Sequence, residues 1–226
     1  MTLRAVGLDL DDTLAVPDRS RAAILRDAVR SVGGDDLADR IEREHYDAAH
    51  RENQVGETRE GIFEALLRDR APEADVDPAA LATAYREHTA AALRPVEGAT
   101  ELVEELRKSY RVGLLTNGPS TAQRDKIREL GLTDAFDTII VTGELGYPKP
   151  DRRPFEALCR DLDADPSETA YVGDSPEEDV VGAADAGLWV VQVLGEDDDP
   201  HPRGDATVRR SRLADELPGI LADLDG

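Results

Sequence analysis

A pair of aspartates at the end of the first apolar segment constrains this chain more than any other feature. Residues 5–8 are apolar or glycine and predict a buried strand, and Asp9 and Asp11 follow it directly. Alternate side chains of an extended segment point the same way, so both carboxylates can face one centre. Clustered negative charges repel one another unless a cation accompanies them. The pair therefore predicts a cation and a reaction at the carboxyl end of a strand, where open α/β sheets bind ligands.

The order of the predicted elements indicates a parallel sheet. Beyond residue 95, short apolar strands alternate with amphipathic helices, which is typical of an α/β fold. The predicted strands are 112–115, 138–141, 169–172, 189–193 and a short edge strand at 206–208. The predicted helices are 97–110, 121–130, 152–162, 175–186 and 212–224. We therefore expect a Rossmann-like, doubly wound parallel sheet.

The segment after the first strand has no strand pattern for some eighty residues. Its predicted helices are 18–32, 37–50, 57–69 and 78–93, and glycine and proline separate them. This pattern predicts a helical subdomain at 17–94, inserted into a core formed by 1–16 and 95–226. Tyr46, Phe63 and Tyr85 are expected in the core of that subdomain rather than around a ligand.

The charge of the chain excludes several kinds of partner. The formal net charge is -22, with 49 acidic and 27 basic residues. Only three basic residues are lysine, namely Lys108, Lys126 and Lys149. Such a composition predicts a halophilic protein, because concentrated salt screens self-repulsion; an ordinary acidic protein with a biased codon supply is the alternative. A surface of this charge is expected to repel nucleic acid and anionic lipid, so neither nucleic acid nor a membrane is an expected partner.

The sequence also bears on the compartment. Cys159 is the single cysteine, in apolar surroundings that predict a buried thiol. No segment approaches about 20 consecutive apolar residues, the length needed to span a membrane. We therefore expect a cytoplasmic protein. The sequence does not determine its oligomeric state.

Polar residues also follow three other predicted strands. Thr116 and Asn117 end the second, Lys149 lies beyond the third, and Asp174 ends the fourth, with Asp179 close behind. The carboxyl ends of parallel strands meet at one edge of a sheet, so these groups are expected to converge with Asp9 and Asp11. Lys149 is further distinguished by the scarcity of lysine in the chain.

With these motifs the chain resembles the haloacid dehalogenase superfamily. The segment 9–14 matches the DxDxT pattern of its first motif, and Thr116-Asn117-Gly118 matches the second. Lys149-Pro150-Asp151 matches the third, and Gly173-Asp174-Ser175 with Asp179 matches the fourth. The helical insert looks like a type-one cap of that superfamily. The resemblance covers nearly the whole chain.

The resemblance implies roles for the acidic residues. Asp9 would be the nucleophile that forms an aspartyl-phosphate. Asp11 would protonate the departing oxygen and later deprotonate water, with a pKa expected to be raised by neighbouring carboxylates. Asp9, Asp174 and the backbone carbonyl of Asp11 would hold Mg²⁺.

The other matched residues would bind phosphate or support the site. Thr116, Asn117 and Lys149 would contact the phosphoryl oxygens. Thr13 would position the first loop, and Asp179 would support the metal or the lysine. Glu178 is excluded, because Ser175-Pro176-Glu177-Glu178 matches a helix-capping box. In the insert, Arg19, Arg21, His45 and Arg51 are candidates for contacting the substrate.

These roles predict hydrolysis of small phosphomonoesters, so the expected partner is a small phosphorylated metabolite. Asp11 favours this over halide displacement, which needs no leaving-group proton. A 2-haloacid dehalogenase or a sugar phosphomutase of the same superfamily remains an alternative. A non-catalytic module that senses or docks phosphate esters is another.

Overall fold

The computed structural model describes residues 2–53 and 56–226 and contains a parallel sheet at its centre. The strands are β1 (Ala5–Leu8), β4 (Arg111–Thr116), β5 (Thr138–Val141), β6 (Thr169–Gly173), β7 (Trp189–Leu194) and β8 (Ala206–Arg209). Their order is β5-β4-β1-β6-β7-β8, and all neighbours are parallel. The chain therefore winds outward from β1 in both directions, and the predicted doubly wound α/β fold is confirmed.

Helices cover both faces of the sheet because strand side chains alternate between two apolar clusters. Val6 and Leu8 of β1 join the cluster that contains α5 (Ala99–Leu106) and α10 (Leu213–Asp225). Tyr171 of β6 points to the other cluster, with α8 (Arg152–Asp161) and α9 (Gly182–Ala186). Cys159 is buried in this second cluster, as predicted. The remaining short elements are α6 (Ser120–Glu129), α7 (Thr142–Leu145), a π-helical turn η2 (Pro176–Val181), and 3-10 turns η1 (Pro166–Glu168) and η3 (Arg210–Arg212).

The inserted helices form a unit with an apolar core of its own, which we call the cap. Its helices are α1 (Arg21–Ala38), α2 (Arg43–Glu52), α3 (Glu60–Arg70) and α4 (Pro78–Ala92). Tyr46, Phe63 and Tyr85 are buried in that core, as expected. Gly34 interrupts α1 with non-helical dihedral angles (φ 79°, ψ -178°), as the predicted break after residue 32 requires. The next predicted helix, 37–50, differs from the structure, because residues up to Ala38 complete α1 and α2 begins at Arg43.

Two short strands connect the cap to the sheet. β2 (Ala15–Pro17) and β3 (Leu93–Pro95) pair antiparallel, with Pro17 opposite Leu93. The sequence did not predict them, because three residues are too few to show an alternating pattern. We propose domain boundaries within this strand pair, between residues 16 and 17 and between 94 and 95.

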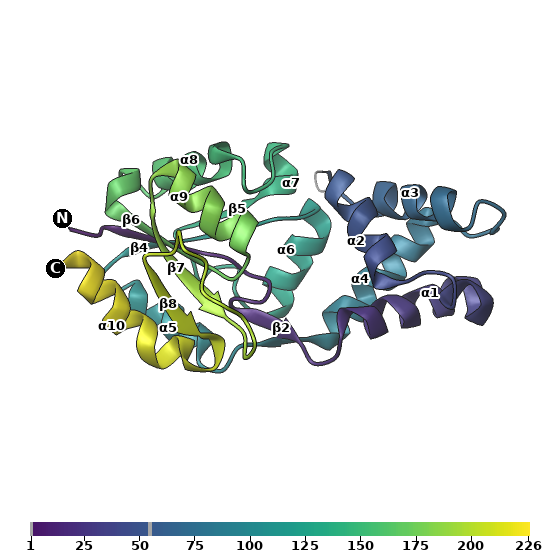
Figure 1. Cartoon of the computed structure of the whole chain (residues 1–226), viewed down its shortest axis with the longest axis horizontal. Helices are drawn as coiled ribbons and strands as arrows, with labels where there is room; N and C mark the ends of the chain where they lie inside the picture. Colours follow the sequence, from purple (N-terminus) through teal and green to yellow (C-terminus); the bar gives the residue numbers. More distant parts are fainter. Residues whose placement is uncertain (1, 54–55) are drawn as a thin grey trace.

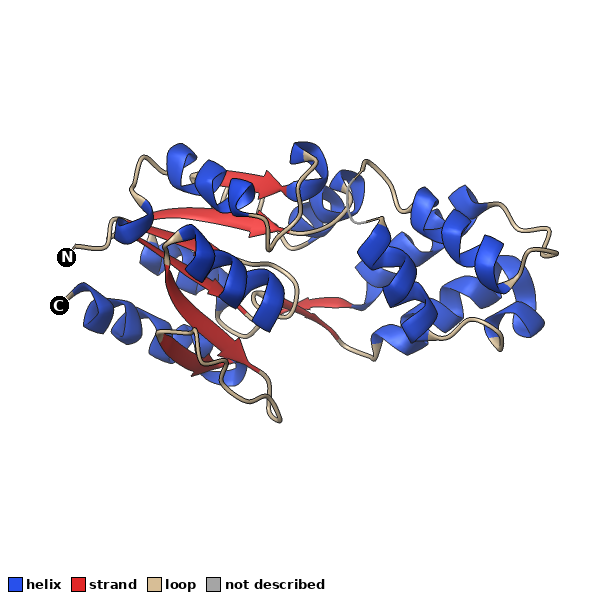
Figure 2. Ribbon diagram, turned by 45° about the horizontal axis from the view of Figure 1, so that its top comes forward, coloured by secondary structure: helices blue, strands red, loops and turns tan. Residues whose placement is uncertain are grey.

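The cap lies against the edge of the sheet where the central strands end, far from both chain termini (Figure 1, Figure 2). A second contact lies away from the connector. Ser120 N donates to Gly56 O at 3.0 Å and Thr121 N to Glu57 O at 3.0 Å, so the loop before α3 rests on the start of α6. Arg86 of α4 pairs with Asp125 of α6 at 3.1 Å. Among the described residues, no helix combines the length and the apolar character needed to cross a membrane.

Close backbone packing at Gly143 yields a stability prediction. A Cβ there would lie 2.6 Å from Gly118 O, 2.7 Å from Gly56 O and 2.8 Å from Ser120 N, and backbone atoms cannot turn aside. We expect Gly143→Ala to lower the free energy of unfolding by about 1–3 kcal/mol, as overpacking does. Urea denaturation measures this.

The matched control is Gly61→Ala in α3, where nothing lies within 4 Å of the new Cβ. There, alanine should raise the free energy of unfolding by about 0.5–1 kcal/mol, since a helical glycine is replaced. Equal stability of Gly143→Ala and the parent protein would contradict the close packing.

Candidate active site

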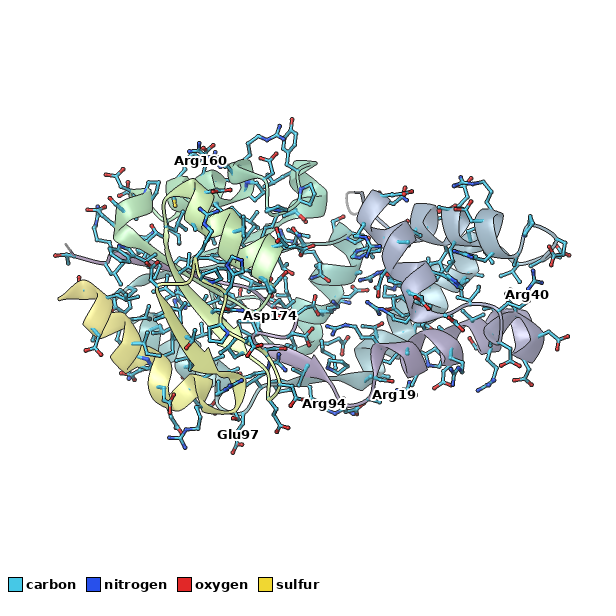
Figure 3. All side chains as sticks on the ribbon, viewed as in Figure 1. Arg19, Arg40, Arg94, Glu97, Arg160 and Asp174 are labelled. Atoms are coloured by element: carbon cyan, nitrogen blue, oxygen red, sulfur yellow. The ribbon has the colours of Figure 1, made fainter. Side chains whose placement is uncertain are left out.

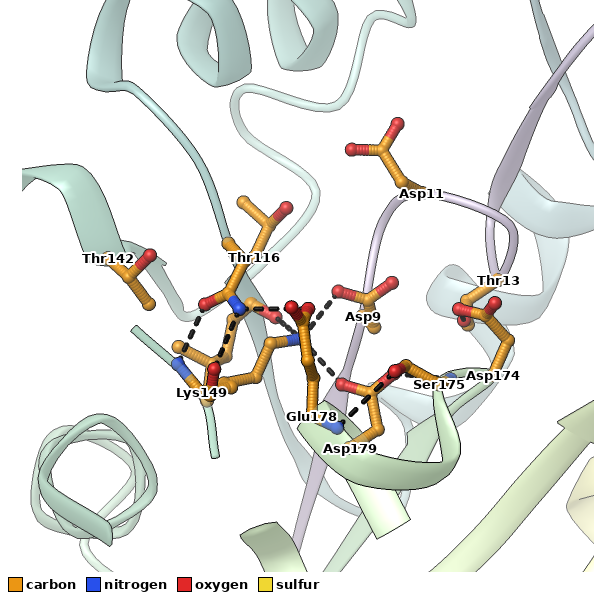
Figure 4. A network of polar contacts seen from close by, with 12 residues as sticks. Asp9, Asp11, Thr13, Thr116, Thr142, Lys149, Asp174, Ser175, Glu178 and Asp179 are labelled. Atoms are coloured by element: carbon orange, nitrogen blue, oxygen red, sulfur yellow. Dashed lines mark hydrogen bonds and ion pairs between the residues drawn. The ribbon is translucent and has the colours of Figure 1, made fainter. Parts of the chain in front are cut away.

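The buried ammonium of Lys149 lies at the centre of a polar network below the cap (Figure 4). Its Nζ donates to Asp179 Oδ1 at 2.6 Å, to Asp9 Oδ1 at 2.7 Å and to the Tyr171 hydroxyl at 2.9 Å. Burial alone would lower the pKa of Lys149, but Asp179 and Asp9 outweigh it and hold that pKa well above its usual value. Lys149 is therefore a fixed positive charge.

Three carboxylates gather beside this ammonium. Asp9, Asp174 and Asp179 each offer an oxygen within 4.8 Å of the others. Burial, reinforced by the neighbouring carboxylates, raises the pKa of Asp9 well above its usual range despite Lys149. Burial and then Asp179 raise the pKa of Asp174 to about 8. In the absence of a cation these carboxyl groups resist ionisation. A hard cation such as Mg²⁺ suits the site, because it stabilises the charged carboxylates and binds oxygen ligands.

Local folding brings these side chains together. Asp9 follows β1, and its backbone N–H donates to Val172 O of the adjacent strand at 2.9 Å. Asp179 lies in η2, and its Oδ2 accepts from Ser175 N at 2.9 Å. Gly173 makes this approach possible, since a Cβ there would lie 2.5 Å from Asp179 Cγ. Thr13 Oγ1 donates to Asp174 Oδ1 at 3.4 Å, which ties the first loop to the fourth motif.

Asn117 joins three of the loops. Its Nδ2 donates to Lys149 O at 3.1 Å and to Glu178 Oε2 at 2.9 Å, while its Oδ1 accepts from Lys149 N at 2.8 Å. Its side chain therefore braces the lysine loop. Glu178 faces this loop, so the predicted capping box is only half formed. Ser175 Oγ accepts from Glu178 N, but Asp179, not Glu178, accepts from Ser175 N.

Thr116 is buried where β4 ends and meets a residue that the sequence analysis missed. Its Oγ1 accepts a hydrogen bond from Gln123 Nε2 of α6. Within the described chain no acceptor takes the Thr116 hydroxyl proton, so that proton is available to a ligand oxygen. Gln123 Nε2 also lies 2.9 Å from Asp11 Oδ2.

The environment of Asp11 corrects one expectation. Lys126 Nζ lies 2.7 Å from both carboxylate oxygens, and in Figure 4 the side chain points away from the Lys149 network. Burial would raise the pKa of Asp11, but Lys126 and then Arg21 outweigh it and hold that pKa well below its usual range. The prediction of a raised pKa was therefore wrong: the nearest charges are cations. The predicted metal contact of Asp11 is its backbone carbonyl, and the side-chain pairing does not test it.

A cavity of about 340 Å³ lies between the polar network and the cap. Asp9, Thr116, Asn117, Lys149 and Asp174 line its sheet side, so these predicted site residues face one space, whereas Thr13 does not line it. Of the four cap candidates, Arg21 lines the cavity, whereas Arg19, His45 and Arg51 do not. The sequence analysis missed further cap residues in its wall: Arg43, His50, Arg59 and Thr89. Tyr46 and Tyr85, expected in the cap core rather than around a ligand, lie in that core but also line the cavity, so this expectation was only half right. Side chains from both units extend into the region between them (Figure 3).

The sequence is similar to a known family of hydrolases and to individual phosphatases. A sequence model of the haloacid dehalogenase-like hydrolases matches residues 3–187. The chain is 30% identical over 213 residues to a glyceraldehyde 3-phosphate phosphatase of Methanopyrus kandleri, covering 91% of each protein. It is 32% identical over 225 residues to a ribulose-1,5-bisphosphate 5-phosphatase of Halopiger xanaduensis, covering 94% of this chain and 91% of that protein.

Solved structures share the fold. A hydrolase of Bacillus subtilis bound to magnesium superposes with a TM-score of 0.73 at 23% identity, covering 98% of this chain and 100% of that one. An L-2-haloacid dehalogenase of Xanthobacter autotrophicus superposes with a TM-score of 0.70 at 18% identity, covering 97% and 100%. Identities this low establish the fold and nothing about the reaction.

Magnesium is expected to stabilise the protein. Binding at about 100 times the dissociation constant contributes about 2.7 kcal/mol, which for a chain of this size raises Tm by roughly 5–10 °C. Because Asp174, with a pKa of about 8, must lose its proton when metal binds, the rise should be larger near pH 8 than near pH 6. Without metal, the folded state holds that proton more tightly than the unfolded state, so stability should fall as pH rises from about 4 towards 8.

Thermal unfolding with and without MgCl₂ measures both effects. Asp174→Asn should lose the magnesium-dependent rise, whereas Glu177→Gln, an exposed acid on the same turn, should keep it. An equal rise in Asp174→Asn would argue against the carboxylate cluster as the metal site.

The pairing of Lys126 with Asp11 yields a further stability prediction. Lys126→Met would leave Asp11 without its ammonium, and because that side chain is 27% exposed we expect a loss of about 1–3 kcal/mol at neutral pH. The loss should shrink as pH falls and the isolated carboxyl becomes protonated. Urea denaturation of Lys126→Met, Asp11→Asn and the double variant gives the coupling energy. Strictly additive losses would show that the two groups do not interact.

Proposed function

The chain belongs to the haloacid dehalogenase-like hydrolase family, and from that premise we propose that it is a Mg²⁺-dependent hydrolase of small phosphomonoesters that forms an aspartyl-phosphate on Asp9. The observation that supports this most directly is the contact of Asp9 with Lys149 beside Asp174 and Asp179, all at the wall of one cavity. Phosphatases with near-full-length similarity support it further.

Asp9 is suited to nucleophilic attack once its carboxylate is charged. One oxygen, Oδ1, contacts Lys149. We propose that Asp9, Asp174 and the backbone carbonyl of Asp11 hold Mg²⁺, which would supply positive charge to the carboxylate and to the bound phosphoryl group. Asp179 also holds Lys149 in place through its Oδ1, and its Oδ2 accepts a hydrogen bond from Ser175 N.

The groups next to Asp9 would bind the oxygens of the phosphoryl group. The Thr116 hydroxyl keeps a proton to donate, and backbone amides near Asn117 would add donors at the end of β4. Lys149 supplies a buried charge that is worth more where water is excluded. Thr13 and the Asn117 side chain position these groups through the contacts described above.

Asp11 is proposed as the acid and base of the reaction. With its pKa held low it is ionised in the structure and ready to take a proton from the water that hydrolyses the intermediate. Protonating the leaving oxygen requires a proton on Asp11, and the Lys126 ammonium opposes that proton while it contacts the carboxylate. We therefore propose that the contact with Lys126 loosens when Asp11 acts as the acid. A halide leaving group needs no such proton, so the presence of a carboxyl group at Asp11 favours phosphoester hydrolysis over dehalogenation.

The size of the cavity supports a small substrate, since pockets of this volume suit metabolites rather than polymers. We propose a small phosphorylated metabolite as the partner and a salt-rich cytoplasm as the compartment. The second proposal rests on the net charge of -22 alone.

Phosphate release in the presence of MgCl₂ tests the function. The assay compares sugar phosphates, phosphoglycolate, glycerol phosphate and nucleotides at several salt concentrations. Asp9→Asn should lower kcat by about 10⁴-fold or more, as loss of a nucleophile does, while Glu177→Gln retains activity. Full activity of Asp9→Asn would refute the nucleophile assignment. Halide release from 2-chloropropionate without phosphate release would establish the dehalogenase instead.

A further inference from the structure

The cap contributes a cationic wall to the cavity of an otherwise strongly acidic protein. Arg21, Arg43 and Arg59 all line the cavity from the cap side, opposite the carboxylate cluster. Most positive charges nearby are already compensated: Arg21 pairs with Asp12 at 2.6 Å and Arg43 with Asp47 at 2.6 Å. Lys126, from α6, is paired with Asp11. Arg59 differs from all of these.

Arg59 is buried without a carboxylate partner. It is 8% exposed, and in the described part of the chain no acidic oxygen lies within 4.0 Å of its guanidinium. Its Nε donates to the Tyr46 hydroxyl at 3.0 Å, and its Cζ lies 5.5 Å from the centre of the Tyr85 ring. Nη1 is buried with no hydrogen-bond partner in the structure. A charged donor left unpaired in the wall of a cavity is costly, unless a ligand completes it.

His50 provides a second unpaired polar atom in the same wall. Its Nε2 is buried with no hydrogen-bond partner, and its ring stacks on Tyr46 with centroids 5.7 Å apart. Burial, followed by Arg59 and Arg43, lowers the pKa of His50 to about 4, so the imidazole is neutral and can donate from Nε2.

Neutral aromatic groups fix these donors in place without cancelling their charge. Tyr46 contacts both Arg59 and His50, and the Tyr85 hydroxyl accepts from Arg43 Nη1 at 3.2 Å. A planar guanidinium held in this way suits a carboxylate or a phosphate, whose oxygens match its paired N–H groups. Arg59 and His50 are not needed to bind the transferred phosphoryl group, because Lys149, Thr116 and the proposed Mg²⁺ contact that group on the sheet side.

We propose that Arg59 and His50 form a subsite for a second anionic group of the substrate, a carboxylate or a phosphate distinct from the phosphoryl group that is cleaved. The inference rests on the proposed function and restricts the class of substrates. The substrate class is a small phosphomonoester that carries another anion at its far end. Arg59 is then the residue that determines specificity.

Matched pairs of substrates test the subsite. 3-Phosphoglycerate and glycerol 3-phosphate differ by a carboxylate, and 1,3-propanediol bisphosphate and propyl phosphate differ by a second phosphate. Wild-type kcat/KM should be about tenfold or more higher for the doubly anionic member of at least one pair, and the pair that shows the preference identifies the anion. Arg59→Gln should lower that ratio by about tenfold or more, mainly through KM.

Two further variants separate the subsite from general damage. Arg68→Gln removes an exposed arginine of α3 and should leave the ratio unchanged. Arg59→Lys keeps the charge without the planar fork and should recover part of the preference. It also decides the question if Arg59→Gln does not fold.

The outcomes distinguish the subsite from the proposed function. No preference within either pair, or an equal loss for both members in Arg59→Gln, overturns the subsite while hydrolysis of the singly anionic esters leaves the phosphatase standing. Absence of Mg²⁺-dependent phosphate release from every ester overturns the proposed function, and the subsite with it.

Discussion

The buried contact of Lys149 with Asp9 and Asp179 is the interaction on which the site depends. Asp9, Asp174 and Asp179 lie close enough to repel one another, and burial strengthens that repulsion. One ammonium placed between Asp9 and Asp179 offsets part of it. The remaining excess of negative charge is relieved either by protons, as the raised pKa values of Asp9 and Asp174 indicate, or by a bound cation. Three strand-end loops, those after β1, β5 and β6, must meet for Lys149 to reach both acids, and the parallel sheet brings them together.

The sequence predicted these loops because each follows a buried strand. Asp9, Thr116 and Asp174 come directly after apolar runs, so a parallel sheet brings them to the same edge. Lys149 was identifiable because lysine is scarce. The same scarcity pointed equally to Lys126, which is also buried in the site, whereas Lys108 is 68% exposed. Lys126 was missed because it lies within a helix, where a single lysine ordinarily faces water.

The cap shows where prediction from sequence ends. Its helices and its aromatic core followed from periodicity, but which arginines face the cavity depends on how the cap docks. Arg19 and Arg21 are two residues apart, yet only Arg21 reaches the wall, whereas Arg19 pairs with Asp27. Arg59 precedes α3 without any local signal, and its orientation comes from contacts with α2 and α4. The ionised state of Asp11 likewise comes from a residue 115 positions away.

The paired connector strands have a consequence for how such proteins diversify. The chain leaves and rejoins the sheet domain at neighbouring points, since Pro17 lies opposite Leu93. The distance that an inserted segment must span is therefore set by the two connector strands, so a cap of another length or shape could be inserted at the same point. Mutations in the cap can change substrate selection without altering the residues of the sheet domain that carry out the reaction.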